Sequence, residues 1–135
     1  MPEISSSALA YPIVPPNGHR PDVMAATCPS RVVLNHVTSR WGVLVLIVLL
    51  QETLRFSALR RHIGGVSERM LAQTLQTLEA DGFVLRRSFD VVPPHVEYSL
   101  TPLGREVAGH VAKLAEWIEG NLDRISGQGF SPAAQ

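Results

Sequence analysis

The sequence predicts a mainly α-helical fold with a small β-hairpin, a winged helix-turn-helix that ends in a long C-terminal dimerisation helix. Three stretches of the chain lead to this prediction. Residues 56–81 contain a short and a longer helical segment separated by Gly64 and Gly65, as in a helix-turn-helix. Two strand-like runs, 83–91 and 96–101, then flank a proline-bearing turn. From residue 102 to about residue 124, apolar side chains recur every three or four positions, as on one helix face.

Length and charge restrict the class of protein. The chain has 135 residues, which suits one domain, and its 12 basic and 12 acidic residues argue against binding nucleic acid by bulk charge. The charge is uneven, because residues 31–105 contain nine arginines against six acidic residues, a surplus of three positive charges. Arginine makes forked contacts to phosphate and guanine that lysine does not make. The surplus therefore favours a specific contact with double-stranded DNA.

The single cysteine, Cys28, excludes an internal disulfide and predicts a reducing compartment, the cytoplasm. The N-terminus lacks the basic segment and apolar run of a secretory signal. Residues 41–50 are the most apolar stretch, but they have about half the length needed to cross a bilayer. We therefore expect a buried core helix and no membrane partner.

The N-terminal half begins with a proline-rich segment. Residues 1–26 contain five prolines and three consecutive serines, which favours a flexible arm, with one folded domain following over residues 27–125. A first helix is expected from Cys28 and Pro29, because proline is tolerated at the first helical position. Its predicted apolar side consists of Val32, Val33, His36 and Val37. A second helix over residues 40–51 is apolar all round and is expected to be buried.

The helix-turn-helix carries the predicted reading surface. Ser57 and Ser67 are the expected N-caps of its two helices. On the second helix Leu71, Leu75 and Leu78 share one stripe, and Arg69, Gln73 and Gln76 share the opposite side. Because such polar side chains bridge base edges, this helix is predicted to enter a DNA major groove. The alternative is an ordinary helical hairpin with a solvated polar face.

The candidate DNA contacts divide into two kinds. Arg69 and Gln73 are the predicted base contacts, because the first turns of a recognition helix reach the groove floor. The candidate contacts to the DNA backbone are Gln76 and Thr77, further along this helix, with Ser57, Ser67 and Arg60. For the serines the alternative is capping alone, and for the arginine it is a solvated side chain.

The hairpin follows directly on the helix-turn-helix and is therefore interpreted as a wing. Arg86 and Arg87 lie on its first strand and are further DNA-binding candidates. Neighbouring strand residues face opposite ways, so only one of the two is expected to point at a given groove.

The C-terminal helix is predicted to form the seam of a homodimer, because its apolar stripe is longer than a small domain can cover alone. The alternative is that the stripe folds back on the helix over residues 40–51. The predicted seam consists of Leu103, Val107, Val111, Leu114, Trp117 and Ile118. Residues 126–135 are expected to form a flexible tail.

Cys28 has two interpretations. A helix start favours the thiolate, the species that oxidants attack, so Cys28 is a candidate redox sensor. The alternative is an inert small core residue. No second cysteine exists in the chain, so a switch needs a disulfide to another subunit or a small thiol. The five histidines show no metal-ligand spacing, and neither a metal nor a cofactor is predicted.

Several runs of the sequence together resemble the HxlR-type winged helix-turn-helix transcriptional regulators. These runs are Cys28-Pro29, Arg40-Trp41, Leu54-Arg55-Phe56, and then IGGVSERML over 63–71, LQTLEADGFV over 75–84 and VPPHVEYSLT over 92–101. The resemblance covers about residues 28 to 120, and its two most specific parts are the runs at 63–71 and 93–101.

The resemblance implies a bacterial homodimer that binds an inverted-repeat operator. It also implies that the helix over 67–81 enters the major groove, that the wing touches the flanking DNA, and that terminal helices build the dimer. Some members sense oxidants or electrophiles through a cysteine placed as Cys28 is. The resemblance names no effector for this chain.

Two competing classes of protein remain. An enzyme using Cys28 with a distant histidine has no other support, because the sequence has no phosphate-binding glycine loop, nucleophile elbow or clustered carboxylates. A winged helix used only for protein–protein contacts is the stronger alternative, because the net charge is zero. The polar side chains of the predicted reading surface argue against it.

Overall fold

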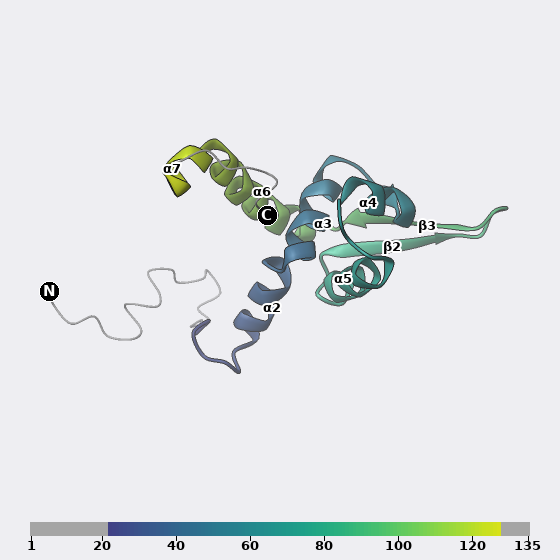
Figure 1. The fold of residues 1–135 in the computed structure, drawn as a ribbon. Helices are drawn as coiled ribbons and strands as arrows, with labels where there is room; N and C mark the ends of the chain where they lie inside the picture. The colour runs from purple at the N-terminus through teal and green to yellow at the C-terminus, as the bar shows by residue number, and fades with distance from the viewer. Residues whose placement is uncertain (1–21, 128–135) are drawn as a thin grey trace, which may run out of the picture.

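The computed structural model describes residues 22–127 and has the predicted mainly helical, winged helix-turn-helix fold (Figure 1). Most of the predicted arm and tail, residues 1–21 and 128–135, lies outside the described residues. The elements in chain order are α2 (Pro29–Val37), α3 (Arg40–Gln51), β1 (Leu54–Arg55), α4 (Phe56–His62), α5 (Glu68–Ala80), β2 (Val84–Phe89), β3 (His95–Leu100), α6 (Pro102–Gly120) and α7 (Leu122–Ser126).

Helix α5, the predicted reading helix, begins where the sequence predicts. The hydroxyl of Ser67 accepts a hydrogen bond from the backbone N–H of Met70 at 3.1 Å, which satisfies one of the free N–H groups at the start of α5. Ser39 and Thr101 cap α3 and α6 in the same way. Side-chain caps therefore fix the starts of the three longest helices.

The prediction that Ser57 caps α4 is wrong. The helix begins two residues earlier than a Ser57 cap implies, at Phe56, and the N-cap position is Arg55, whose side chain makes no capping bond. The cause is β1, which pairs with β3 and keeps the chain extended up to Arg55. This short strand also makes the predicted hairpin a three-stranded antiparallel sheet, with the order β1-β3-β2.

Helix α3 lies at the centre of the core. Val45, Leu46 and Leu49 are at most 1% exposed and pack with the buried leucines of α4 and α5. Leu44 is 38% exposed, so the helix is buried on most sides rather than all round. Within the described part of the chain, no single helix is long and apolar enough to cross a membrane; α2 and α3 pass that test only as a pair bent by 68°.

Helix α6 has two apolar faces instead of one stripe. Gly104, Ala108 and Val111 are buried in the core of their own chain, and α6 packs against α3. Gly104 is required near the start of α6, because a Cβ there would collide with the carbonyl oxygen of Phe83, the residue just before β2. Val111, a residue of the predicted seam, is only 6% exposed and lies on the buried face of its own chain.

The predicted long C-terminal helix is also interrupted. It ends at Gly120, and after the C-cap residue Asn121 the chain starts the short helix α7. Figure 1 shows α6 and α7 extending away from the winged-helix body, on the side opposite the wing tip.

Helix α2 contributes less to the core than predicted. Its only buried residue is Val37, whereas Val32 and Val33 are exposed. Leu34 is exposed too, at 44%. The reason is that α2 projects from the body of the domain (Figure 1), which leaves these apolar side chains uncovered.

Candidate nucleic-acid interface

The core holds one side of α5 and leaves the opposite side exposed. Leu71, Leu75 and Leu78 are at most 1% exposed and fix the rotation of α5 about its axis. The polar ridge, which we define as Arg69, Gln73 and Gln76, is exposed on the opposite side, as helical periodicity requires. The side chains predicted to read bases therefore lie together on one accessible surface.

The turn before α5 modifies two of the predicted backbone contacts. Arg60 forms an exposed ion pair with Glu68, with its Nη1 at 3.4 Å from a carboxylate oxygen, so part of its charge is already balanced. Ser67 uses its hydroxyl oxygen for the cap of α5. Ser57 is exposed at the second position of α4 and makes no cap. Gly65 has a φ of +87°, a conformation that favours glycine in this turn.

The wing carries its two arginines on opposite faces. Arg86 pairs across the sheet with Tyr98 and Arg87 with Glu97, so the two side chains alternate as strand geometry requires. The guanidinium carbon of Arg87 lies 4.9 Å from the centroid of the Phe89 ring, a cation–π contact that holds the side chain along the strand. Both arginines are exposed.

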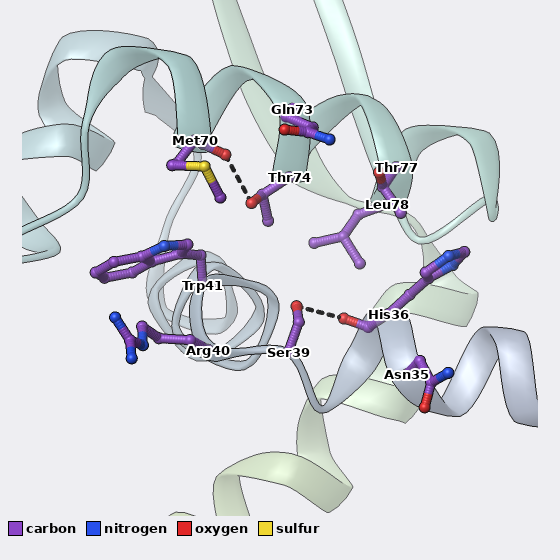
Figure 2. A pocket seen from close by; sticks show the side chains of 10 residues that line it. All are labelled: Asn35, His36, Ser39, Arg40, Trp41, Met70, Gln73, Thr74, Thr77 and Leu78. Atoms are coloured by element: carbon purple, nitrogen blue, oxygen red, sulfur yellow. Dashed lines mark hydrogen bonds between the residues drawn. The ribbon is translucent and has the colours of Figure 1, made fainter.

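An open groove of about 440 Å³ runs beside α5, and Figure 2 shows the side chains around it. Met70, Thr74 and Thr77 of α5 form one wall, with Gln73 at its edge. Thr77 is half-buried there and belongs to this flank rather than to the polar ridge. The opposite wall comes from the corner between α2 and α3, with Asn35, His36, Ser39, Arg40 and Trp41. No sequence pattern indicated that this corner belongs to the site, although the Arg40-Trp41 pair was part of the family resemblance.

A polar link joins α2 to the far end of α5. Nδ1 of His36 lies 2.6 Å from Oδ2 of Asp81, the C-cap residue of α5, and both side chains are partly buried. A hydrogen bond of this kind contributes about 1 kcal/mol to stability. His36 was expected on the apolar side of its helix; it instead helps to set the position of the reading helix.

Cys28 occupies the predicted N-cap position of α2 and is partly exposed. A hydrogen bond with the Ser30 side chain lowers the pKa of the Cys28 thiol below its ordinary value. Backbone hydrogen bonds at Asp22 and at the helix start lower this pKa further, and they outweigh the opposite effect of burial. Cys28 is not part of the core cluster, so the setting suits a reactive thiol better than an inert one.

Apart from the buried Val111, most residues of the predicted seam are exposed on one face of α6. Leu103, Leu114 and Trp117 are 52–56% exposed, and Ile118 is 40% exposed. Val107 is half-buried and packs against the core as well. We call Leu103, Leu114, Trp117 and Ile118 the exposed apolar face of α6. Over residues 22–127, no group of three or more His, Cys, Asp or Glu side chains is placed to hold a metal ion.

Comparison with known proteins gives a consistent result. A family profile described as HxlR-like helix-turn-helix matches residues 36–126. The HTH-type transcriptional regulator YtfH of Escherichia coli K12 is 64% identical over 104 residues, which cover 77% of this chain and 82% of YtfH.

Two solved structures extend the comparison. The transcriptional regulator ytfH from Salmonella typhimurium is 63% identical with a TM-score of 0.75, covering 79% of this chain and 96% of that one. The redox regulator HypR in its reduced form is 35% identical with a TM-score of 0.67, covering 73% of this chain and 98% of HypR.

Proposed function

The chain belongs to the HxlR family of helix-turn-helix transcriptional regulators, which are not enzymes. We propose that it binds an inverted-repeat operator as a homodimer and responds to oxidants or electrophiles through Cys28. The observation that carries the DNA-binding part is the exposed polar ridge of α5, opposite its buried leucines. In this proposal residues 27–125 form the DNA-binding and dimerisation domain.

The proposed contacts with DNA follow the order of the elements. Arg69 and Gln73 read base edges in the major groove, because they lie in the first two turns of α5. Arg86 and Arg87 are the wing candidates, and because they lie on opposite faces, one of the two contacts DNA beside the operator half-site. The contacts to the sugar-phosphate backbone are Gln76 and Thr77 of α5, with Ser57, Ser67 and Arg60. Because Arg60 is paired with Glu68, it is the weakest of the charged candidates.

The proposed dimer rests on the exposed apolar face of α6. Four large apolar side chains on one face of one helix leave a patch that contact with a second copy removes from water. Helix α2 adds Val32, Val33 and Leu34, which are also exposed. Aromatic residues such as Trp117 are the usual anchors of such interfaces. A twofold axis through this seam gives the two α5 helices the symmetry of an inverted repeat.

The proposed redox response begins at Cys28. Its lowered pKa favours the thiolate, which attacks the oxygen of a hydroperoxide, forms a sulfenic acid and releases water or an alcohol. A second thiol then displaces water from the sulfenic acid and forms a disulfide. That thiol comes from a second copy of the chain or from a small molecule, because the chain has one cysteine. The similarity to HypR, which is described as a redox regulator, supports this chemistry.

We expect the affinity of the protein for the DNA upstream of its own coding sequence to fall steeply as the salt concentration rises. A dimer that contacts about 6–10 phosphates loses about 10³–10⁵-fold in affinity between about 50 and 200 mM salt. Electrophoretic shifts at several salt concentrations measure this slope, with random DNA of equal length as the control. A flat or absent response would favour the alternative of a winged helix that contacts only proteins.

For Cys28 we expect thiol-specific labelling at a lower pH than that of free glutathione under the same conditions. The reason is that a lowered pKa leaves more thiolate at any pH below the ordinary pKa of a thiol. The measurement is the rate of iodoacetamide labelling against pH, with a Ser30→Ala variant that removes the largest cause of the lowered pKa. Labelling that becomes appreciable only under alkaline conditions would contradict a sensor role.

A further inference from the structure

We propose that the groove between α5 and the α2–α3 corner receives a phosphodiester strand of the operator, and that Arg40 is its cationic contact. Arg40 is the first residue of α3 and lies outside both the helix-turn-helix and the wing. The inference rests on the proposed function, because it requires that α5 occupies a major groove. It adds a DNA contact that neither the reading helix nor the wing supplies.

The position of the groove follows from the dimensions of helix and DNA. An α-helix with its side chains is about 10–12 Å wide, and the major groove of B-DNA is about 12 Å wide. When the polar ridge of α5 faces the bases, a sugar-phosphate strand must therefore pass along each flank of the helix. On one flank, Met70, Thr74 and Thr77 face the α2–α3 corner across the groove (Figure 2). The strand on that side meets Arg40 and Asn35.

The charge of this corner suits a phosphate. Arg40 is exposed, and no carboxylate of residues 22–127 lies within ion-pair distance of its guanidinium. The groove is lined by no acidic side chain, and its one histidine, His36, is already bonded to Asp81. Arg60 differs, because it is paired with Glu68. Arg40 therefore offers an unbalanced positive charge beside the reading helix, whereas the charge of Arg60 is partly balanced.

Arg40 is also held in place before DNA arrives. Its guanidinium carbon lies 5.6 Å from the centroid of the Trp41 ring, a cation–π contact. Trp41 is half-buried against the core. Its ring lies beside the turn that precedes α5, because a Cβ on Gly65 of this turn would be 3.8 Å from it. Because the arginine is restrained, binding costs less side-chain entropy than it would for a free arginine. Ser39 does not compete for this role, since its hydroxyl caps α3 and donates to the His36 carbonyl.

The test compares Arg40→Gln with Arg40→Lys and with Arg124→Gln in the full-length protein. Arg124 is an exposed arginine of α7, and its replacement removes the same charge. Figure 1 shows that helix α7 lies far from α5. Arg40→Gln is expected to weaken binding to operator and random DNA by the same factor. It is also expected to lower the slope of log affinity against log salt by about one per bound chain. Arg40→Lys should keep the wild-type slope, and Arg124→Gln should leave both quantities unchanged.

A second measurement maps the contacted phosphates, and its first part uses the wild-type protein alone. Ethylation of single operator phosphates shows which phosphates the wild-type protein needs for binding. We expect one of them on the α2–α3 side of each half-site. Ethylation of this phosphate should no longer interfere with binding by Arg40→Gln. An unchanged salt slope and an unchanged footprint in Arg40→Gln would overturn the inference while operator binding stands. Altered base preference with an unchanged slope would overturn it as well. If the wild-type protein binds no DNA, the proposed function itself fails, which is a different result.

Discussion

Replacing Arg69 by alanine is expected to weaken operator binding by about 1–3 kcal/mol while changing the affinity for random DNA much less. The structure places Arg69 in the first turn of α5, exposed and directly opposite the buried leucines. It forms no ion pair with a carboxylate of residues 22–127, so its guanidinium is available for a forked contact with guanine. Losing that contact removes discrimination between bases rather than general attraction to DNA.

The measurement is a set of binding curves for the operator, for single-base operator variants and for random DNA. Arg69→Lys is the matched control, because it keeps the charge and loses the fork. We expect Arg69→Lys to retain affinity for random DNA and to lose part of the base preference. If Arg69→Ala loses equal affinity on the operator and on random DNA, Arg69 is a phosphate contact and base reading must come from elsewhere on the ridge.

The parts of the fold that the sequence predicted well depend on local signals. The bounds of α3 follow from a continuous apolar run, and the start of α5 follows from its capping serine, Ser67; both are confirmed. The exposed polar side of α5 follows from apolar periodicity, because the rotation of a helix is set by its own leucines. These features need no knowledge of how distant segments meet.

The parts that were missed depend on contacts between distant segments. β1 is only two residues long and exists because β3, more than forty residues later, pairs with it. The buried face of α6 consists largely of Gly104 and Ala108. Such small residues do not form an apolar stripe in the sequence, although they allow α6 to pack closely against the rest of the domain. The groove beside α5 requires the α2–α3 corner to lie against the reading helix. No periodicity in the sequence reports that placement, so Arg40 was left out of the predicted site.

Replacing Trp117 by glutamate is expected to separate the proposed homodimer into monomers and to weaken operator binding by at least a hundredfold, about 2.7 kcal/mol. Trp117 is 56% exposed in the single chain, together with Leu114 and Ile118 on the same face of α6. A charge buried at the centre of an apolar interface is costly, and the twofold symmetry applies the change twice. Binding to one half-site should remain, because Trp117 lies on α6 and the polar ridge lies on α5.

This separation of effects makes the experiment decisive about the seam. Sedimentation equilibrium reports the oligomeric state, and shift assays with a full operator and with a single half-site report the two kinds of binding. Trp117→Phe is the control, since it keeps an apolar ring and should remain dimeric. If Trp117→Glu stays dimeric with unchanged operator affinity, the seam does not use this face, and the exposed valines of α2 become the surface to test. If Trp117→Glu is monomeric and still binds the full operator as tightly as the wild type, pairing of chains contributes nothing to DNA affinity, and the inverted-repeat arrangement is wrong.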